Sequence, residues 1–467
     1  MPLTLHLLAV AVFAMGTSEF MLAGLLPDIA VDLGVPIATA GLLTSAFAVG
    51  MVVGAPLMAG LARRWPRRSS LLGFLGLFVA AHALGAVTGD FTVLLTTRVV
   101  AAVANAGFLA VALTTAADLV PADRKGRALS VLLAGTTLAI ITGVPGGALL
   151  GTLLDWRATF WAVAALCLLS ALGVARALPP TTLDVAGAVP DTAPGVVGAV
   201  SGTTSEAARA VSDAAPGVVG AVSDTAPGVE GVVSDTTSEV AGAVSDAAPG
   251  LVGAVPDVVR RTVGAPVPDL RRELGLLRRP RLALILLLGA LVNAATFGTF
   301  TFLAPIVTDV ADLGPLWIPV VLVLFGLGAF TGTTIAGRLA DHRPGTVIAV
   351  GGPLLLGGWA AFALTASQPP ALLLLAFTQG ALSFALGGTL IARALYEAAD
   401  APTMAGSYAT AALNVGAAVG PVLAAAALTT GAAGPGPVWV SGILVAAALL
   451  LALLRRRDFE RVEGGAR

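Results

Sequence analysis

The sequence predicts an all-α membrane protein of twelve transmembrane helices, arranged as two six-helix bundles. Three observations predict this fold: a very apolar composition, twelve apolar windows of membrane-spanning length, and two halves that echo each other. Of the 467 residues, 57% are hydrophobic and only 11% are charged, against about 25% charged residues in soluble proteins. Such a chain belongs in a bilayer. Its single cysteine, Cys167, excludes a disulfide within the chain.

Each of the twelve windows is long enough to cross the hydrocarbon, which takes about 20 apolar residues. Their apolarity is continuous and does not alternate, which predicts helices and not the strands of a barrel. The first window is too long for the core of a signal peptide, so we expect it to remain as a span. The predicted spans are 3–26, 38–61, 69–88, 91–117, 127–152, 158–177, 281–306, 315–340, 346–367, 370–394, 404–428 and 438–454.

Basic residues gather in alternate loops between these spans, which predicts that both termini face the cytoplasm. The stretch 63–68 holds four arginines, 124–127 holds two arginines and a lysine, and 260–279 holds six arginines. The opposite loops carry aspartates and, of the basic residues, Arg157 alone.

The two halves of the chain echo each other across a long hydrophilic stretch. The segments "GAPLMAGLARRWP" (54–66) and "GTTIAGRLADHRP" (332–344) end the second and eighth spans and share four identities. The two members of each identical pair are separated by the same number of residues, so Gly332 corresponds to Gly54. We call this constant separation the repeat offset. Parallel repeats of six spans are typical of transporters, whose substrate site lies near the membrane midplane between the repeats. We therefore predict an N-terminal bundle over 1–177, a cytoplasmic linker over 178–280, a C-terminal bundle over 281–455 and a cytoplasmic tail over 456–467.

The linker contains an eleven-residue repeat, typified by "VSDAAPGVVGA", in six copies over 189–254. Pro-Gly in four of the copies interrupts a helix, and the acidic character of the segment repels it from an anionic leaflet. We expect a mostly disordered tether. A regulatory or partner-binding role is the alternative.

Three ionisable side chains lie within the predicted hydrocarbon region: Glu19, Arg98 and His82. Glu19 and Arg98 each lie seven residues from the outer end of their span, at a similar depth of about 10 Å, so an ion pair or a shared water network is possible. Charges at this depth usually line a cavity. Burial favours the neutral carboxyl and a nearby arginine favours the ionised one, so separating the pair would switch protonation. Glu19 and Arg98 are therefore candidate proton-coupling residues, with a purely structural pair as the alternative.

His82 is expected to be a packed, hydrogen-bonded bystander, because it stands alone among small apolar residues. The three histidines are far apart in the sequence, so nothing predicts a metal site or another cofactor.

Polar and aromatic residues recur on one face of three further spans, as a cavity for an amphipathic ligand requires. Arg98, Ala102 and Asn105 share one face of span 4 at helical spacing. The alternative is that the asparagines bond helix to helix and the phenylalanines pack in the core. The candidate substrate-binding residues are Asn105, Asn293, Phe297, Phe300, Tyr408 and Asn414.

Span 5 carries a small residue at every fourth position from Gly135 to Gly151, a ridge that lets another helix approach closely. Pro145 removes one backbone hydrogen bond and permits a bend. Such a helix either slides along a neighbouring helix during transport or packs tightly against it.

Four segments together carry a family resemblance: "GTSEFMLAGLLPDIAVDLGV" (16–35), "TTRVVAAVANAGF" (96–108), "GVPGG" (143–147) and "DWRATFW" (155–161). They resemble the motifs of the drug:proton antiporter branch of the major facilitator superfamily. The N-terminal half, notably "ANAGFLAVALTTAADLVPADRKGRALSVLLAGTT" (104–137), is similar to actinobacterial chloramphenicol-resistance exporters. The resemblance covers the spans and not residues 178–270.

The resemblance implies roles for two further groups of residues. In the loop after span 2, "AGLARRWPRR" (59–68) has Arg63 where the superfamily pattern has an aspartate, which puts the latch formed by that aspartate in question; the second copy, "GRLAD" (337–341), keeps its aspartate. The implied antiporter-motif residues are Gly143, Pro145, Gly146 and Gly147, and the implied gating-loop residues are Arg64, Arg67, Arg68 and Asp341.

The function that the resemblance implies is proton-coupled efflux of a small amphipathic antibiotic, chloramphenicol-like, across a bacterial plasma membrane. The expected partners are the drug, protons and the lipid bilayer, with no nucleic acid and no cofactor, and the expected state is a monomer. One alternative is an exporter of sugars or other metabolites, and another is a membrane scaffold or sensor that uses the repeat linker. An enzyme is not expected, because no nucleophile–base or metal constellation is present.

Overall fold

A computed structural model describes residues 3–61, 66–121, 124–177, 275, 279–340, 344–398, 405–429 and 434–455. Every regular element within these residues is a helix, and twelve helices are long and apolar enough to cross a membrane. The predicted fold class and span count are therefore confirmed. The repeats at 189–254 and the tail at 456–467 lie outside the described residues, so the predicted domain boundaries stay a prediction, as does the cytoplasmic location of both termini.

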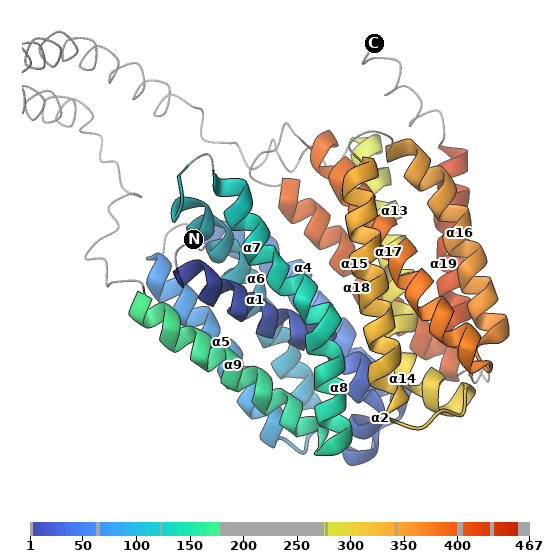
Figure 1. Ribbon diagram of the computed structural model, residues 1–467, viewed down its shortest axis with the longest axis horizontal. Coiled ribbons are helices and arrows are strands. Elements are labelled where there is room, and N and C mark those ends of the chain that lie inside the picture. The colour runs from blue at the N-terminus through green and yellow to red at the C-terminus, as the bar shows by residue number, and fades with distance from the viewer. Residues whose placement is uncertain are drawn as a thin grey trace, which may run out of the picture. The chain divides into compact units, whose positions relative to one another are not determined.

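The N-terminal bundle carries the blue-to-green helices of Figure 1. Its elements are α1 (Leu3–Phe20), α2 (Leu22–Asp32), α3 (Ile37–Ala40), α4 (Leu42–Leu61), α5 (Arg67–Val87), α6 (Phe91–Asp118), α7 (Lys125–Leu138), the π-helix η3 (Ala139–Gly143), α8 (Val144–Leu153) and α9 (Trp156–Ala177).

The C-terminal bundle carries the yellow-to-red helices (Figure 1). Its elements are α13 (Pro280–Thr301), α14 (Leu303–Pro305), the π-helix η5 (Ile306–Val310), α15 (Trp317–Ala340), α16 (Pro344–Thr365), α17 (Pro369–Glu397), α18 (Ala405–Thr429) and α19 (Gly436–Leu454). Both bundles belong to one compact unit of the chain.

Four predicted spans are interrupted in the structure. The first breaks at Met21, between α1 and α2, the second at Gly41, between α3 and α4, and the seventh at Phe302, between α13 and α14. The fifth contains the π-helix η3 immediately before Pro145. A proline lacks a backbone donor and its ring crowds the carbonyl four residues earlier, so the chain relaxes into a wider turn at this point.

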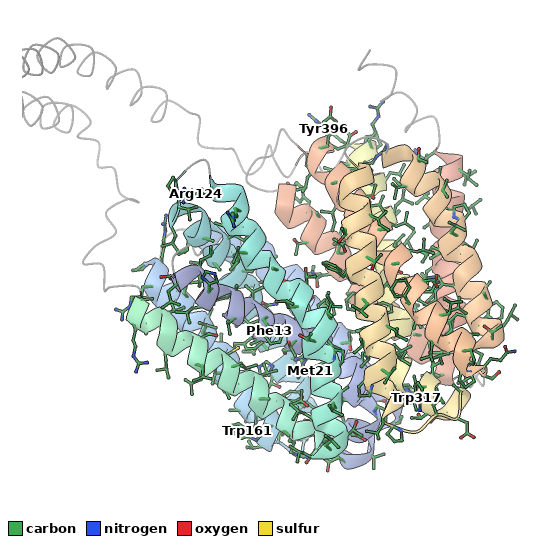
Figure 2. The ribbon with its side chains drawn as sticks, viewed as in Figure 1. Phe13, Met21, Arg124, Trp161, Trp317 and Tyr396 are labelled. Carbon is green, nitrogen blue, oxygen red and sulfur yellow. The ribbon has the colours of Figure 1, made fainter. Side chains whose placement is uncertain are left out.

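Two exposed tryptophans, Trp161 and Trp317, lie near the ends of spans. Figure 2 shows Arg124 and Trp161 at opposite ends of the N-terminal bundle, and Tyr396 and Trp317 at opposite ends of the C-terminal bundle. Trp161 and Trp317 are 48% and 41% exposed, as side chains at a membrane–water interface are.

The internal repeat extends through the helix packing. A methyl group at Gly50 of α4 would lie 2.7 Å from the carbonyl oxygen of Val99 in α6, and one at Gly328 of α15 would overlap the carbonyl of Phe377 in α17. Both members of the second pair follow those of the first at the repeat offset. One turn further along, the same offset relates the contact of Gly54 with Val103 to that of Gly332 with Ala381.

The internal repeat also includes a turn with the same backbone conformation in both halves. Gly34 and Asp312, which the repeat offset again places opposite each other, both have a positive φ, at 62° and 52°. Glycine adopts this conformation freely and aspartate is among the few other residues that tolerate it. The two halves therefore share one backbone design from helix contacts down to single turns.

The two bundles contact each other through buried apolar residues. Leu26, Ala30 and Ala40 of the N-terminal bundle form one buried cluster with Phe302 and Ala424 of the C-terminal bundle. A second cluster joins Ala23, Val144 and Ala148 to the core of the C-terminal bundle. The N-terminal members of both clusters come from α2, α3 and α8, which lie at the predicted outer end of the bundle.

Candidate functional site

The site is built where α1 ends. Ser18 lies in the last turn of α1, just before the interruption at Met21. Arg98 of α6 reaches this turn and donates from Nη2 to the Ser18 carbonyl oxygen at 2.7 Å. A hydrogen bond from a charged donor is stronger than a neutral one, so the Ser18 carbonyl oxygen helps to compensate the guanidinium charge.

A chain of hydrogen bonds continues from the same serine. Arg98 Nη1 donates to Ser18 Oγ at 2.8 Å, Ser18 Oγ lies 2.7 Å from His82 Nε2, and His82 Nδ1 lies 2.9 Å from the Phe78 carbonyl oxygen. His82 is therefore hydrogen-bonded through both ring nitrogens, in line with the expected packed histidine, but it belongs to the charged site and is not remote from it.

Aromatic rings enclose the side chains of Arg98 and His82. Arg98 is only 1% exposed, and its guanidinium carbon lies 4.5 Å from the centre of the Phe47 ring of α4, within the range of a cation–π interaction. The His82 ring stacks on Phe78 at 4.2 Å and lies 5.6 Å from Phe160 of α9. Nothing in the sequence marks Phe47 as a partner of Arg98, because their contact depends on how α4 packs against α6.

Glu19 follows Ser18 directly and is partly exposed. It interacts electrostatically with Arg98 but forms no hydrogen bond or close ion pair with any described residue. The structure thus brings the two predicted proton-coupling residues into one site, while the guanidinium contacts Ser18 and not the carboxylate.

Beside Glu19, Phe20 begins a row of aromatic rings that joins the two bundles. Its ring lies 5.7 Å from that of Phe297 and 6.3 Å from that of Phe300, both in α13. The row continues from Phe300 to Phe325 of α15 at 4.9 Å, and from there to Phe384 of α17 at 6.3 Å. Two of the predicted binding residues, Phe297 and Phe300, are therefore adjacent to the charged site.

The remaining predicted binding residues are engaged in local contacts. Asn293 donates to the carbonyl of Leu413 at 2.7 Å, which links α13 to α18. Asn105 contacts the Met51 sulfur at 3.7 Å, and Asn414 donates to the Thr410 carbonyl of its own helix at 2.9 Å. Tyr408 is buried in the apolar core of the C-terminal bundle. The bond of Asn293 fits the alternative of interhelical bonding, and their part in ligand binding stays a prediction.

The predicted antiporter-motif residues lie on both sides of the helix break in span 5. A side chain at Gly143 would overlap the Thr17 hydroxyl of α1, and one at Gly147 would approach Thr159 of α9 to 2.9 Å, whereas Gly146 faces open space. Pro145 is buried at the start of α8. Gly143 and Gly147 therefore serve close packing, against α1 and α9 respectively, whereas Gly146 does not.

Two of the predicted gating-loop residues are described. Arg67 forms an ion pair with Asp118 of α6 at 2.7 Å, and Arg68 Nη2 donates to the Ala175 carbonyl of α9 at 2.9 Å. Arg64 and Asp341 lie outside the described residues.

At the predicted outer end, Arg157 ties three elements together. It forms an ion pair with Asp32 at 2.6 Å and donates to the Thr88 carbonyl at 3.2 Å. Nearby, desolvation and then the negative charge of Asp155 raise the pKa of Asp28 above its ordinary value. In the part of the chain that the structure describes, no three metal-ligating side chains lie close enough to share an ion.

Twelve spans in two repeated bundles, with a buried charged site and an aromatic row between them, define a membrane transporter and not an enzyme. The sequence profile of the Major Facilitator Superfamily matches residues 8–411. The chain belongs to this superfamily, as its motifs predicted, and is a multi-pass protein of the bacterial plasma membrane.

Comparison with characterised and solved proteins agrees with this assignment. The chain is 58% identical to the "Chloramphenicol resistance protein" of Streptomyces lividans over 97% of its own length and 96% of the relative. It is 28% identical to "Inner membrane transport protein YdhP" of Escherichia coli K12 over 96% and 95% of the two chains. Among solved structures, a mutant of the peptide transporter POT shares the fold, with a TM-score of 0.64 and 16% identity over 98% of this chain and 94% of the other.

Proposed function

We propose that the protein exports a small amphipathic antibiotic of the chloramphenicol type in exchange for protons, by alternating access. The observation that carries the proposal is the 58% identity, over nearly the whole chain, to the Streptomyces lividans chloramphenicol resistance protein. At that identity over both bundles, the residues that line the pathway are expected to be largely shared. The protein acts as a monomer in this proposal, because one chain supplies both bundles.

The charged site supports a proton-coupled cycle. Glu19 lies between Ser18, which binds the guanidinium, and Phe20, which begins the aromatic row. In our proposal the Glu19 carboxylate takes up a proton from outside while the drug leaves outward, and it releases that proton to the cytoplasm before the next drug enters. Arg98 tunes this exchange, since its charge favours the ionised carboxylate.

The aromatic row supports a site for a flat apolar group. Phe297 and Phe300 present rings from the C-terminal bundle toward Phe20 of the N-terminal bundle, so a ligand ring held here would contact both bundles. Aromatic walls with few polar groups suit an amphipathic drug. The amides and hydroxyl of Asn105, Asn293, Tyr408 and Asn414 complete the proposed binding set.

Replacement of the carboxylate tests the coupling. In everted membrane vesicles, we expect Glu19→Gln to reduce pH-gradient-driven uptake of labelled chloramphenicol to the level seen with a protonophore, because an amide cannot exchange the proton. Glu397→Gln is the matched control, because Glu397 lies at the very end of α17 and should leave uptake intact. Wild-type uptake by Glu19→Gln at equal protein level in the membrane would refute the proposed coupling.

A further inference from the structure

We propose that Ser18 and His82 are positioning residues, which hold the Arg98 guanidinium on the end of α1 and thereby leave Glu19 without a contacting counter-ion. This inference rests on the proposed function, because it explains how a carboxylate beside a buried arginine stays available for proton exchange. It is carried by the hydrogen-bond geometry, by the behaviour of the other hydroxyls in the chain, and by the internal repeat.

The Ser18 hydroxyl behaves differently from its neighbour. Within a helix, serine and threonine hydroxyls usually donate to a carbonyl three or four residues earlier. Thr17 does so to Phe13 at 2.8 Å, and Ser70 and Ser170 do likewise. Ser18 instead turns away from its own helix toward His82 of α5 and Arg98 of α6.

The donor and acceptor inventory sets the direction of each bond. A guanidinium only donates, so Ser18 Oγ accepts from Arg98, and its single proton is left for His82 Nε2. The Phe78 carbonyl only accepts, so the proton of the neutral imidazole lies on Nδ1. His82 thus draws the Ser18 proton away from the α1 carbonyls and turns the oxygen lone pairs toward Arg98.

The orientation of the Ser18 hydroxyl decides which partners Arg98 and Glu19 have. Both terminal nitrogens of the guanidinium are bonded to Ser18, one to the hydroxyl and one to the carbonyl. The face of the guanidinium lies over the Phe47 ring. Without the hydroxyl, one terminal nitrogen loses its partner, and the carboxylate of the adjacent residue, Glu19, becomes available to it as an acceptor. An ion pair formed in this way would hold the carboxylate in its charged form and oppose protonation.

The second half of the chain provides an internal comparison. The repeat offset places Thr296, Ala360 and Ala376 opposite Ser18, His82 and Arg98. With neither the histidine nor the arginine, the Thr296 hydroxyl donates to the Val292 carbonyl of its own helix at 2.8 Å. The hydroxyl therefore bonds to neighbouring helices in the repeat that has the histidine and the arginine, and to its own helix in the repeat that lacks them.

The charged and titratable groups around Ser18 are few among the described residues. α1 contributes Glu19, α5 contributes His82 and α6 contributes Arg98, while α4 and α9 face the site with the rings of Phe47 and Phe160. Among the described residues, no hydrogen bond or ion pair joins another charged side chain to Arg98 or Ser18.

A pair of amide substitutions tests the inference on purified protein in proteoliposomes. In His82→Gln the side-chain oxygen can take the place of Nε2 and still accept from Ser18, whereas in His82→Asn the shorter amide can take only the place of Nδ1. Two rates are measured for each variant: pH-gradient-driven uptake of labelled chloramphenicol, and exchange of labelled for unlabelled chloramphenicol without a gradient.

We expect His82→Asn and Ser18→Ala to lose about tenfold or more in gradient-driven uptake, the order expected for losing a hydrogen bond to a charged group, and to keep exchange within about twofold. His82→Gln and Ser18→Thr, which keep the acceptor and the hydroxyl, should retain most of both rates. If the two amide variants behave alike, or if Ser18→Ala retains gradient-driven uptake, the inference is wrong.

A second measurement does not depend on the cargo and separates this inference from the proposed function. Histidine labelled with ¹⁵N should show, for the signal that His82→Gln removes, a neutral ring with its proton on Nδ1, and Ser18→Ala should shift the Nε2 signal. A doubly protonated ring, or no response to Ser18→Ala, overturns the inference. Wild-type protein that shows this spectrum but transports no chloramphenicol overturns the proposed function alone.

Discussion

A buried guanidinium at position 98 has to be compensated within the protein, because a charge removed from water loses several kcal/mol of solvation. Here the compensation is spread over three partners. One charge-assisted hydrogen bond reaches the Ser18 hydroxyl, a second reaches the Ser18 carbonyl oxygen, and the Phe47 ring lies against the cation. At the scale of single residues, the site therefore stabilises the charge of Arg98 without an ion pair to the neighbouring carboxylate of Glu19.

Position 143 requires glycine because it packs closely against Thr17 of α1, the helix that also carries Ser18. We expect Gly143→Ala to lower stability by about 1–3 kcal/mol, because the added methyl group would overlap the Thr17 hydroxyl. Gly146→Ala, three residues along the same motif, meets open space and is the matched control. Thermal unfolding of both variants in detergent measures the difference; equal melting temperatures would contradict this explanation of the motif.

At the scale of elements, the fifth span is the most specialised. The π-helix η3 precedes Pro145, and the widened turn presents the Ile140 carbonyl to Gly326 of α15, where an added methyl group would lie 2.7 Å away. The wide turn thus lies at a contact between the two bundles. A π-turn is often found at functional sites, and here it lets the helix of one bundle lie directly against a helix of the other.

Replacement of the proline should separate stability from transport. We expect Pro145→Ala to raise the melting temperature, because a proline inside a helix costs about 3 kcal/mol through its missing donor and its ring clash, and to slow turnover, because the wide turn is lost. Pro353→Ala in α16, whose proline lies in a helix without a π-turn, should leave turnover unchanged. Unchanged turnover in Pro145→Ala would show that the turn has no part in transport.

At the scale of the whole molecule, the two bundles share a backbone design and differ in chemistry. The repeat offset relates glycine contacts and turns in the two halves, but it sets Phe297 opposite Glu19 and Ala376 opposite Arg98. One bundle therefore carries the pair Glu19 and Arg98, and the other carries most of the aromatic row that begins at Phe20. In the proposed transport cycle, such a division would let the proton site and the cargo site adjoin each other while belonging to different bundles.

Motion between the bundles should respond to the α15 contact. We expect Gly326→Ala to shift the protein toward states in which α8 and α15 are further apart, because the added methyl group crowds the Ile140 carbonyl. Spin labels at the exposed positions Leu154 and Leu316, in a Cys167→Ser background, report that distance. Gly357→Ala in α16, which meets open space, should leave the distribution unchanged. An unchanged distribution in Gly326→Ala would show that the contact does not restrain the bundles.

Sequence reasoning found Glu19 and Arg98 because each is a charge in an apolar run, and it matched their depths because rise along a helix is constant. It did not find Ser18, Phe47 or Phe20. A serine and two phenylalanines within apolar helices carry no signal of their own, and their roles follow from which helix faces which. His82 was expected to be a bystander for the same reason, since its partner lies 64 residues away in the chain.

The sequence by itself determined the twelve spans, the two halves and the superfamily, because span length, apolarity and motif residues are local properties of the chain. Only the tertiary structure decided that the guanidinium contacts a serine and not the adjacent carboxylate, and that an aromatic row joins the bundles beside it. A hydrogen bond depends on distances of a few tenths of an ångström between helices that are far apart in sequence, and helix packing sets those distances.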